Sequence, residues 1–201
     1  MAGDTRERMI EAAVHALQRD GVEGMYFTEV LRESGAARGA IYHHFPGGKS
    51  QLVAEAATEN GNEVRALLAR LPAESPVAVV RGFLALIRPV VQESAGGSGC
   101  AVAAAAMASS VHDHDRLHNA AAVAIGSWVS ELTGRFAAAG LAQGEAHALA
   151  STLITILEGA HVLARATGGI DRFDETARAV TLLVEHRYGQ LLDAEEAVSP
   201  G

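Results

Sequence analysis

Residues 28–44 read TEVLRESGAARGAIYHH, and their spacing of apolar residues and glycines indicates two short helices. Gly35 interrupts the pattern, so we expect one helix at residues 28–34 and another at residues 38–44. Two short helices joined by a tight turn that contains glycine are typical of a helix-turn-helix, whose second helix enters the major groove of DNA. We expect inward-facing side chains between the helices at Val30, Leu31, Ile41 and Phe45.

Helical patterns extend in both directions from this pair. Residues 5–19 carry an apolar stripe with a 3.6-residue period, with Asp4 or Thr5 as the expected cap and Gly21 as the expected end. A longer helix is expected from residue 49 or 50 to about residue 70. The remaining helices are expected at residues 76–93 (kinked or ended by Pro89), 101–109, 113 or 115 to 140, 143–167 and 171–192. Since no segment alternates polar and apolar residues, the sequence predicts an all-α fold.

The composition narrows the class of protein. Hydrophobic residues make up 49% and aromatic residues 4% of the 201 residues, so the core must consist mainly of Ala, Val and Leu. Cys100 is the only cysteine, which excludes an intrachain disulfide and fits a reducing cytoplasm. We expect no signal peptide, because acids and bases alternate at the N-terminus, and no membrane helix, because no run of 18 apolar residues occurs.

Charge is unevenly distributed along the chain. The formal net charge is −8, of which residues 1–50 contribute −1 and residues 51–201 contribute −7. Residues 34–54 contain Arg38, His43, His44 and Lys49 but no acid. An acidic body repels phosphate, so only this short segment is expected to approach a nucleic acid.

The segment from Thr5 to about Leu52 resembles the TetR family of bacterial transcriptional regulators. The resemblance is most specific in Gly35-Ala-Ala-Arg-Gly-Ala-Ile-Tyr-His-His-Phe45, followed by Lys49 and Leu52. Pro46-Gly-Gly-Lys49 and Gly99-Cys100 are similar to the LmrA/YxaF-like branch. The resemblance implies an N-terminal three-helix helix-turn-helix domain for DNA binding at residues 1–48 and a C-terminal helical bundle for ligand binding and dimerisation at residues 49–192. Residues 193–201 are expected to form a disordered tail.

Carried over residue by residue, the resemblance implies a DNA-contacting set at the second short helix. Arg38 would read a base, Gly39 would allow close approach, and Ala40 could pack on a thymine methyl group. The other implied contacts are Tyr42, His43 and Lys49. Two of these residues have an alternative role. Tyr42 could pack against neighbouring side chains, and Lys49 could be a charge exposed to solvent. The sequence departs from the family where Met25-Tyr26, Ala37 and Ala40 replace the usual polar residues.

The same resemblance implies a homodimer that binds a pseudo-palindromic operator in double-stranded DNA and is released by a small apolar or amphipathic effector. We expect the effector to change the spacing of the two recognition helices through a tilt of the helix that begins at residue 49. Dimerisation is expected along Leu149, Leu153, Ile156 and Leu157 on one helix and Ala177, Val180, Leu183 and Val184 on the next. Candidate pocket residues are Phe83, Ile87, Cys100, Met107, Trp128, Leu132, Leu157 and His161.

An enzyme is the main alternative. Residues 112–118 contain three histidines and two aspartates, which could bind a metal or cofactor in a helical enzyme or carrier, although the aspartates also suit a helix N-terminus. A protein that only binds other proteins, with a vestigial helix-turn-helix, is a further alternative. The chain carries no hydrolase, phosphate-binding or dinucleotide motif, so we expect no catalytic residue, no metal and no cofactor. Cys100 is expected to be a small buried hydrophobe.

Overall fold

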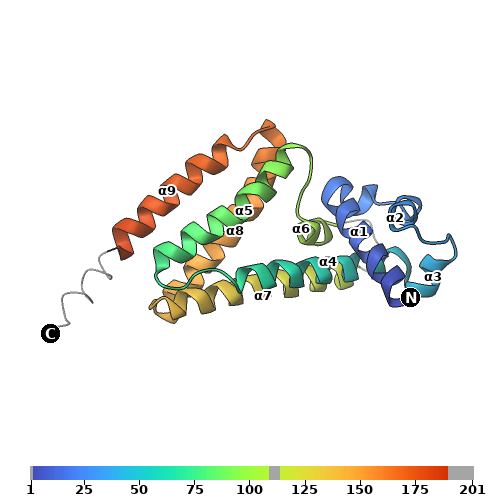
Figure 1. The fold of residues 1–201 in the computed structure, drawn as a ribbon, viewed down its shortest axis with the longest axis horizontal. Coiled ribbons are helices and arrows are strands. Elements are labelled where there is room, and N and C mark those ends of the chain that lie inside the picture. Colours follow the sequence, from blue (N-terminus) through green and yellow to red (C-terminus); the bar gives the residue numbers. More distant parts are fainter. Residues whose placement is uncertain (1, 109–113, 190–201) are drawn as a thin grey trace. The chain divides into compact units, whose positions relative to one another are not determined.

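The computed structural model describes residues 2–108 and 114–189, and the secondary structure within these ranges is entirely α-helical, as the sequence predicted (Figure 1). Residues 109–113 and 190–201, which include the predicted tail, lie outside the description. The described helices are α1 (Ala2–Gly24), α2 (Phe27–Ser34), α3 (Ala40–His44), α4 (Gly48–Leu68), α5 (Pro76–Ala95), α6 (Ala101–Ala106), α7 (His114–Ala138), α8 (Gln143–Thr167) and α9 (Asp171–Tyr188).

The chain divides into two compact units. The first comprises Met1–Arg65 and Gly97–Ser127, and the second comprises Ala66–Gly96 and Trp128–Gly201. The boundaries fall inside α4 and α7, so each of these helices supplies residues to both units. The predicted division after residue 48 differs from these boundaries, and the assignment of DNA binding and ligand binding to its two sides stays a prediction.

In the first unit, α1 packs against α2 and α6. Large apolar side chains from α1, α3 and α4 meet in its core, and Val30 and Ile41 are buried as predicted. Leu31 is only half-buried, less than predicted. Fully buried large side chains of this unit are Met9, Leu17, Met25, Ile41, Phe45, Leu52 and Leu117.

The ends of the N-terminal helices differ from the predictions in two places. α1 begins at Ala2, so Asp4 and Thr5 lie inside the helix and cannot cap it. Gly21 interrupts α1 where the sequence predicted an end: its φ of 68° and ψ of −175° are not helical, and a short second helical segment then continues to Gly24. Such a backbone conformation is open to glycine and strained for other residues. Gly35, by contrast, closes α2 in the left-handed conformation, with its N–H bonded to the carbonyl of Leu31.

α5 begins with a conventional cap and tolerates an internal proline. The Ser75 hydroxyl accepts the N–H of Ala78 at 3.1 Å, and Pro76 occupies the first turn, where its missing N–H costs nothing. The helix then runs past Pro89 to Ala95, so the predicted early end at Pro89 is wrong. Pro89 lies on the exposed face together with Ala85, whose carbonyl loses its helical partner and faces water.

The second unit is built from α5, α8 and α9, which contact one another pairwise and lie side by side in Figure 1. Ion pairs attach α9 to its neighbours: Arg88 of α5 holds Asp174 with two bonds of 3.0 and 3.1 Å, and Arg81 pairs with Glu185. Buried apolar residues fill the interior, among them Phe83, Trp128, Leu132, Phe136 and Leu153.

The apolar stripes predicted to pair with a second copy are only partly exposed. Leu153, Leu157 and Val184 are buried within their own chain, so they are not available to a partner. Leu183, a member of the predicted stripe, is exposed, and so are three apolar residues outside the stripes: Val162 and Leu163 of α8 and Leu182 of α9. α8 is long and apolar enough to cross a membrane by length and composition alone, which is weak evidence because the core helix of a globular protein meets the same criteria. In the second unit α8 packs against α5 and α9.

Candidate nucleic-acid interface

The second helix of the helix-turn-helix is shorter than the sequence predicted. α3 spans only Ala40–His44, and Arg38 and Gly39 form the turn that leads into it, closed by the Ala40 N–H bonded to the Ala37 carbonyl at 2.8 Å. Gly39 occupies the N-cap position without a side-chain bond, and Ala37 has no side chain that could supply one. Arg38 therefore projects from the turn before α3 rather than from the helix itself.

Burial separates the two sides of this segment clearly. Ile41 and Phe45 have almost no solvent exposure and anchor α3 in the first unit. The side chains predicted to contact DNA lie on the other side: Arg38, Gly39, Tyr42 and His43 are exposed, whereas Ala40 and Lys49 are half-buried. The structure thus brings the six predicted residues to the turn, to α3 and to the start of α4.

Tyr42 combines packing with exposure. Its ring meets Phe27 of α2 edge to face, with ring centroids 6.0 Å apart and planes at 86°. It nevertheless remains 67% exposed. Edge-to-face contact fixes the ring while leaving the remainder of the side chain accessible. Tyr42 is thus more exposed than the packing alternative required, and its contact with DNA stays a prediction.

Tyr26 is a further exposed aromatic residue next to this surface. It sits at the N-cap of α2, makes no capping bond, and is 65% exposed. The Nζ atom of Lys49, at the start of α4, lies 5.9 Å from the centre of its ring. Partial burial lowers the pKa of Lys49 below its ordinary value, while Glu23 acts in the opposite direction. From the sequence, Tyr26 was noted only as a departure from the family pattern. A large aromatic residue just before a predicted helix was the one feature that could have marked it as a functional residue.

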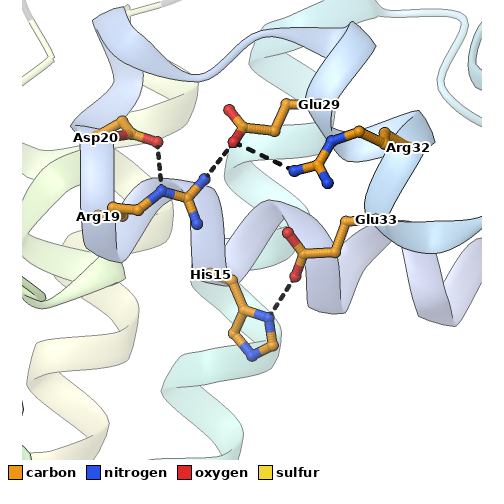
Figure 2. A network of polar contacts seen from close by, with 6 residues as sticks. All are labelled: His15, Arg19, Asp20, Glu29, Arg32 and Glu33. Atoms are coloured by element: carbon orange, nitrogen blue, oxygen red, sulfur yellow. Dashed lines mark hydrogen bonds and ion pairs between the residues drawn. The ribbon is translucent and has the colours of Figure 1, made fainter.

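A network of polar contacts holds α2 against α1 (Figure 2). Arg19 of α1 donates to Glu29 of α2 at 2.7 Å and to its neighbour Asp20 at 3.0 Å. His15 of α1 lies 2.7 Å from Glu33, the other acid of α2. Both acids of the first helix of the helix-turn-helix are thereby engaged by α1, which limits their repulsion of an approaching anion.

The candidate pocket residues fall into both units. Phe83, Ile87, Trp128, Leu132, Leu157 and His161 are buried in the second unit. Cys100 and Met107 belong to the first unit, and Met107 is 74% exposed at the end of α6, which corrects its expected place in an apolar interior. Cys100 is half-buried rather than buried, and its Sγ caps α6 by accepting the Ala103 N–H at 3.3 Å.

A buried polar pair lies between α5 and α8. The Ser94 hydroxyl is 2.7 Å from Nδ1 of His161 and 3.0 Å from the carbonyl of Val90. A hydroxyl has one hydrogen, so both bonds form together only when Ser94 donates to Val90 and His161 donates from Nδ1. Nε2 of the neutral ring is then an acceptor. Burial lowers the pKa of His161, which favours this neutral form.

The histidine cluster receives little support as a metal site. His112 and Asp113 lie outside the described residues, and only the backbone of His114 is described. Within residues 2–108 and 114–189, no group of three His, Cys, Asp or Glu side chains is arranged to hold a metal ion.

Comparison with known proteins agrees with the helix-turn-helix geometry. Residues 9–56 match the model for bacterial regulatory proteins of the tetR family, and residues 76–179 match the model for the C-terminal domain of LmrA/YxaF-like transcriptional regulators. An uncharacterised HTH-type transcriptional regulator of Mycobacterium tuberculosis is 33% identical over 89% of this chain and 93% of its own length. HTH-type transcriptional regulator LmrA of Bacillus subtilis is 42% identical, over 33% of this chain and 36% of its own.

Solved structures of low sequence identity share the fold. A TetR-family regulator from Agrobacterium tumefaciens superposes with a TM-score of 0.76 at 19% identity, covering 92% of this chain and 99% of that one. A TetR-family regulator from Chloroflexus aurantiacus superposes with a TM-score of 0.74 at 21% identity, covering 93% of this chain and 97% of that one. The helix-turn-helix, the two domain matches and the nearly full-length relative lead to one assignment: this chain belongs to the TetR family of transcriptional regulators, in its LmrA/YxaF-like group, whose members are DNA-binding proteins and not enzymes.

Proposed function

We propose that this protein is a repressor that binds operator DNA through the segment from Arg38 to Lys49 and leaves it when a small molecule binds the second unit. The observation that carries the proposal is the sidedness of α3. Ile41 and Phe45 are buried, whereas Arg38, Tyr42 and His43 are exposed, in a segment that contains no acid. In the cytoplasm, where bacterial DNA lies, only this part of an acidic protein would be attracted to phosphate.

Each residue of the surface has a distinct proposed role. Arg38, exposed in the turn before α3, can form two bonds to a guanine edge, and Gly39 beside it presents no side chain that would keep the backbone away. Ala40 offers a methyl group to thymine. Tyr42, His43 and Lys49 donate hydrogen bonds to phosphates, which position the protein without reading sequence.

Regulators of this family act as dimers, and we propose the exposed apolar faces of α8 and α9 as the contact between copies. Val162, Leu163, Leu182 and Leu183 support this proposal because four large apolar side chains on two neighbouring helices are unusual on a monomer's surface. A two-fold dimer presents two copies of α3, so the operator should be a pseudo-palindrome with half-sites spaced by whole helical turns of about 34–36 Å.

The proposed effector is apolar or amphipathic, because the candidate lining in the second unit is apolar apart from the Ser94–His161 pair. We propose Phe83, Ile87, Trp128, Leu132, Leu157 and His161 as lining residues. α4 continues without a break from the first unit into the second, so a shift of its C-terminal end can change the spacing of the DNA-reading helices. An effector that prefers the mismatched state by about 3 kcal/mol shifts the equilibrium between the two states by over a hundredfold.

Two linked measurements test the proposal. The full-length protein selects binding sequences from a random duplex library, and a thermal-shift screen identifies apolar or amphipathic compounds that stabilise it. We expect a pseudo-palindrome to be enriched, and the stabilising compounds to weaken binding of that duplex. The variant Tyr42→Ala serves as control, because it should keep compound binding while losing duplex affinity. Compounds that bind but leave duplex affinity unchanged would contradict the proposed coupling.

A further inference from the structure

Tyr26, which is exposed, and Lys49, which is half-buried, form an aromatic–cation pair that joins the start of α2 to the start of α4. The Lys49 ammonium lies 5.9 Å from the Tyr26 ring centre, within the range of a cation–π interaction. The two residues are 23 positions apart in sequence, so the fold rather than local helix geometry brings them together.

Neither structural stability nor helix capping accounts for the tyrosine. Its side chain makes no capping bond to α2, and 65% of its surface is exposed. Residues that carry the core in this region, Met25 and Val30, are instead fully buried. A large aromatic ring left in water at the edge of the candidate DNA surface buries little apolar area, so its contribution to folding is small.

The ring restricts a side chain that is otherwise highly mobile. A lysine ammonium on a four-carbon stem loses considerable rotamer freedom when it is fixed on a phosphate. Glu23 is the nearby acid that attracts Lys49, and contact with the ring limits how far the ammonium can move toward it. The contact with Tyr26 places the Lys49 ammonium beside the ring before any DNA is bound.

We propose that Tyr26 is a positioning residue for DNA binding, which holds the Lys49 ammonium for a backbone phosphate of the operator. The inference rests on the proposed function, since it requires that this surface binds DNA. Tyr26 lies outside α3, and its proposed role depends on the face of its ring and not on its hydroxyl.

The test uses the full-length protein and a duplex selected by the wild-type protein from a random library, with affinity measured by fluorescence anisotropy at several salt concentrations. Tyr26→Ala should weaken binding by about two- to tenfold for each protomer, the loss associated with immobilising one long side chain. It should also reduce the salt dependence, as Lys49→Ala does, because one phosphate contact is lost. Tyr26→Phe and Tyr26→Trp, which keep a ring face, should retain affinity.

The double variant separates positioning from a structural effect. If Tyr26 acts through Lys49, then Tyr26→Ala should add little to the loss already caused by Lys49→Ala. Additive losses, or a Tyr26→Phe variant as weak as Tyr26→Ala, would overturn the inference while leaving the proposed function intact. Failure of the wild-type protein to select any duplex would instead overturn the proposed function itself.

Discussion

The substitution Gly61→Ala tests how closely α4 approaches α7 in the first unit. A Cβ atom at Gly61 would lie 2.7 Å from the Cβ of Ala124 and 3.5 Å from its Cα. Ordinary contact begins at 3.4 Å, so the two helices must separate by about 0.7 Å or distort. Forcing an extra methyl group into a packed contact costs about 1–3 kcal/mol, whereas alanine favours helix over glycine by about 1 kcal/mol. We therefore expect a net loss of about 1 kcal/mol.

Urea unfolding at a fixed protein concentration measures this loss, because the stability of a dimer depends on concentration. Gly126→Ala is a matched control: Gly126 lies in α7 of the same unit, and a Cβ there meets nothing within 4 Å. The control should be stabilised by up to about 1 kcal/mol through helix propensity alone. Ala124→Gly removes the opposing methyl group and should restore part of the stability of Gly61→Ala.

Equal stabilisation by Gly61→Ala and Gly126→Ala would refute the reasoning, because no steric conflict would then exist at Gly61. Strictly additive effects of Gly61→Ala and Ala124→Gly would refute it as well, since residues in direct conflict must be coupled.

Three other perturbations test different parts of the molecule. Arg38→Ala should weaken binding of the selected duplex by about 1–3 kcal/mol and relax the preference for one base. Anisotropy with single-base variants of the duplex measures both effects, and an unchanged preference at every position would show that Arg38 does not contact a base. Because burial lowers the pKa of His161, the folded state binds fewer protons than the unfolded state, so stability should be lost as pH falls from the ordinary value of 6.5 through the lowered pKa. His161→Gln should reduce that loss in urea titrations between pH 5 and pH 8, and an identical pH profile would exclude His161 as its source. Leu182→Glu combined with Leu183→Glu should yield monomers in sedimentation velocity at micromolar concentration, whereas Val123→Glu, at an exposed site of the first unit, should leave the dimer intact; a dimeric double variant would place the interface elsewhere.

Local patterns were sufficient for the helix-turn-helix. Gly35 marks the turn because a left-handed C-cap strongly favours glycine, and the structure has this conformation there. Ile41 and Phe45 follow from apolar spacing and are both buried. The start of α3 was misplaced because the residues that usually cap a helix are absent before it, leaving Arg38 in a turn.

Features that depend on tertiary packing could not be predicted from periodicity. α8 is apolar on several faces, so its sequence does not distinguish Leu153, which lies in the core of its own unit, from Val162, which is exposed. Met107 was expected in the interior because its side chain is apolar. It instead follows the last turn of the short α6, and 74% of its surface is exposed. The proximity of Tyr26 to Lys49 joins two helices and carries no signal in local sequence.

Anisotropy with paired duplexes measures whether this protein binds DNA in a sequence-specific way. One labelled duplex carries the pseudo-palindrome selected by the protein, and the other has the same base composition in scrambled order. We predict that the protein binds the selected duplex at least about a thousandfold more tightly at physiological salt, as specific regulators do, with one dimer for each pair of half-sites. Equal affinity for the two duplexes, or no binding to either, would contradict the account.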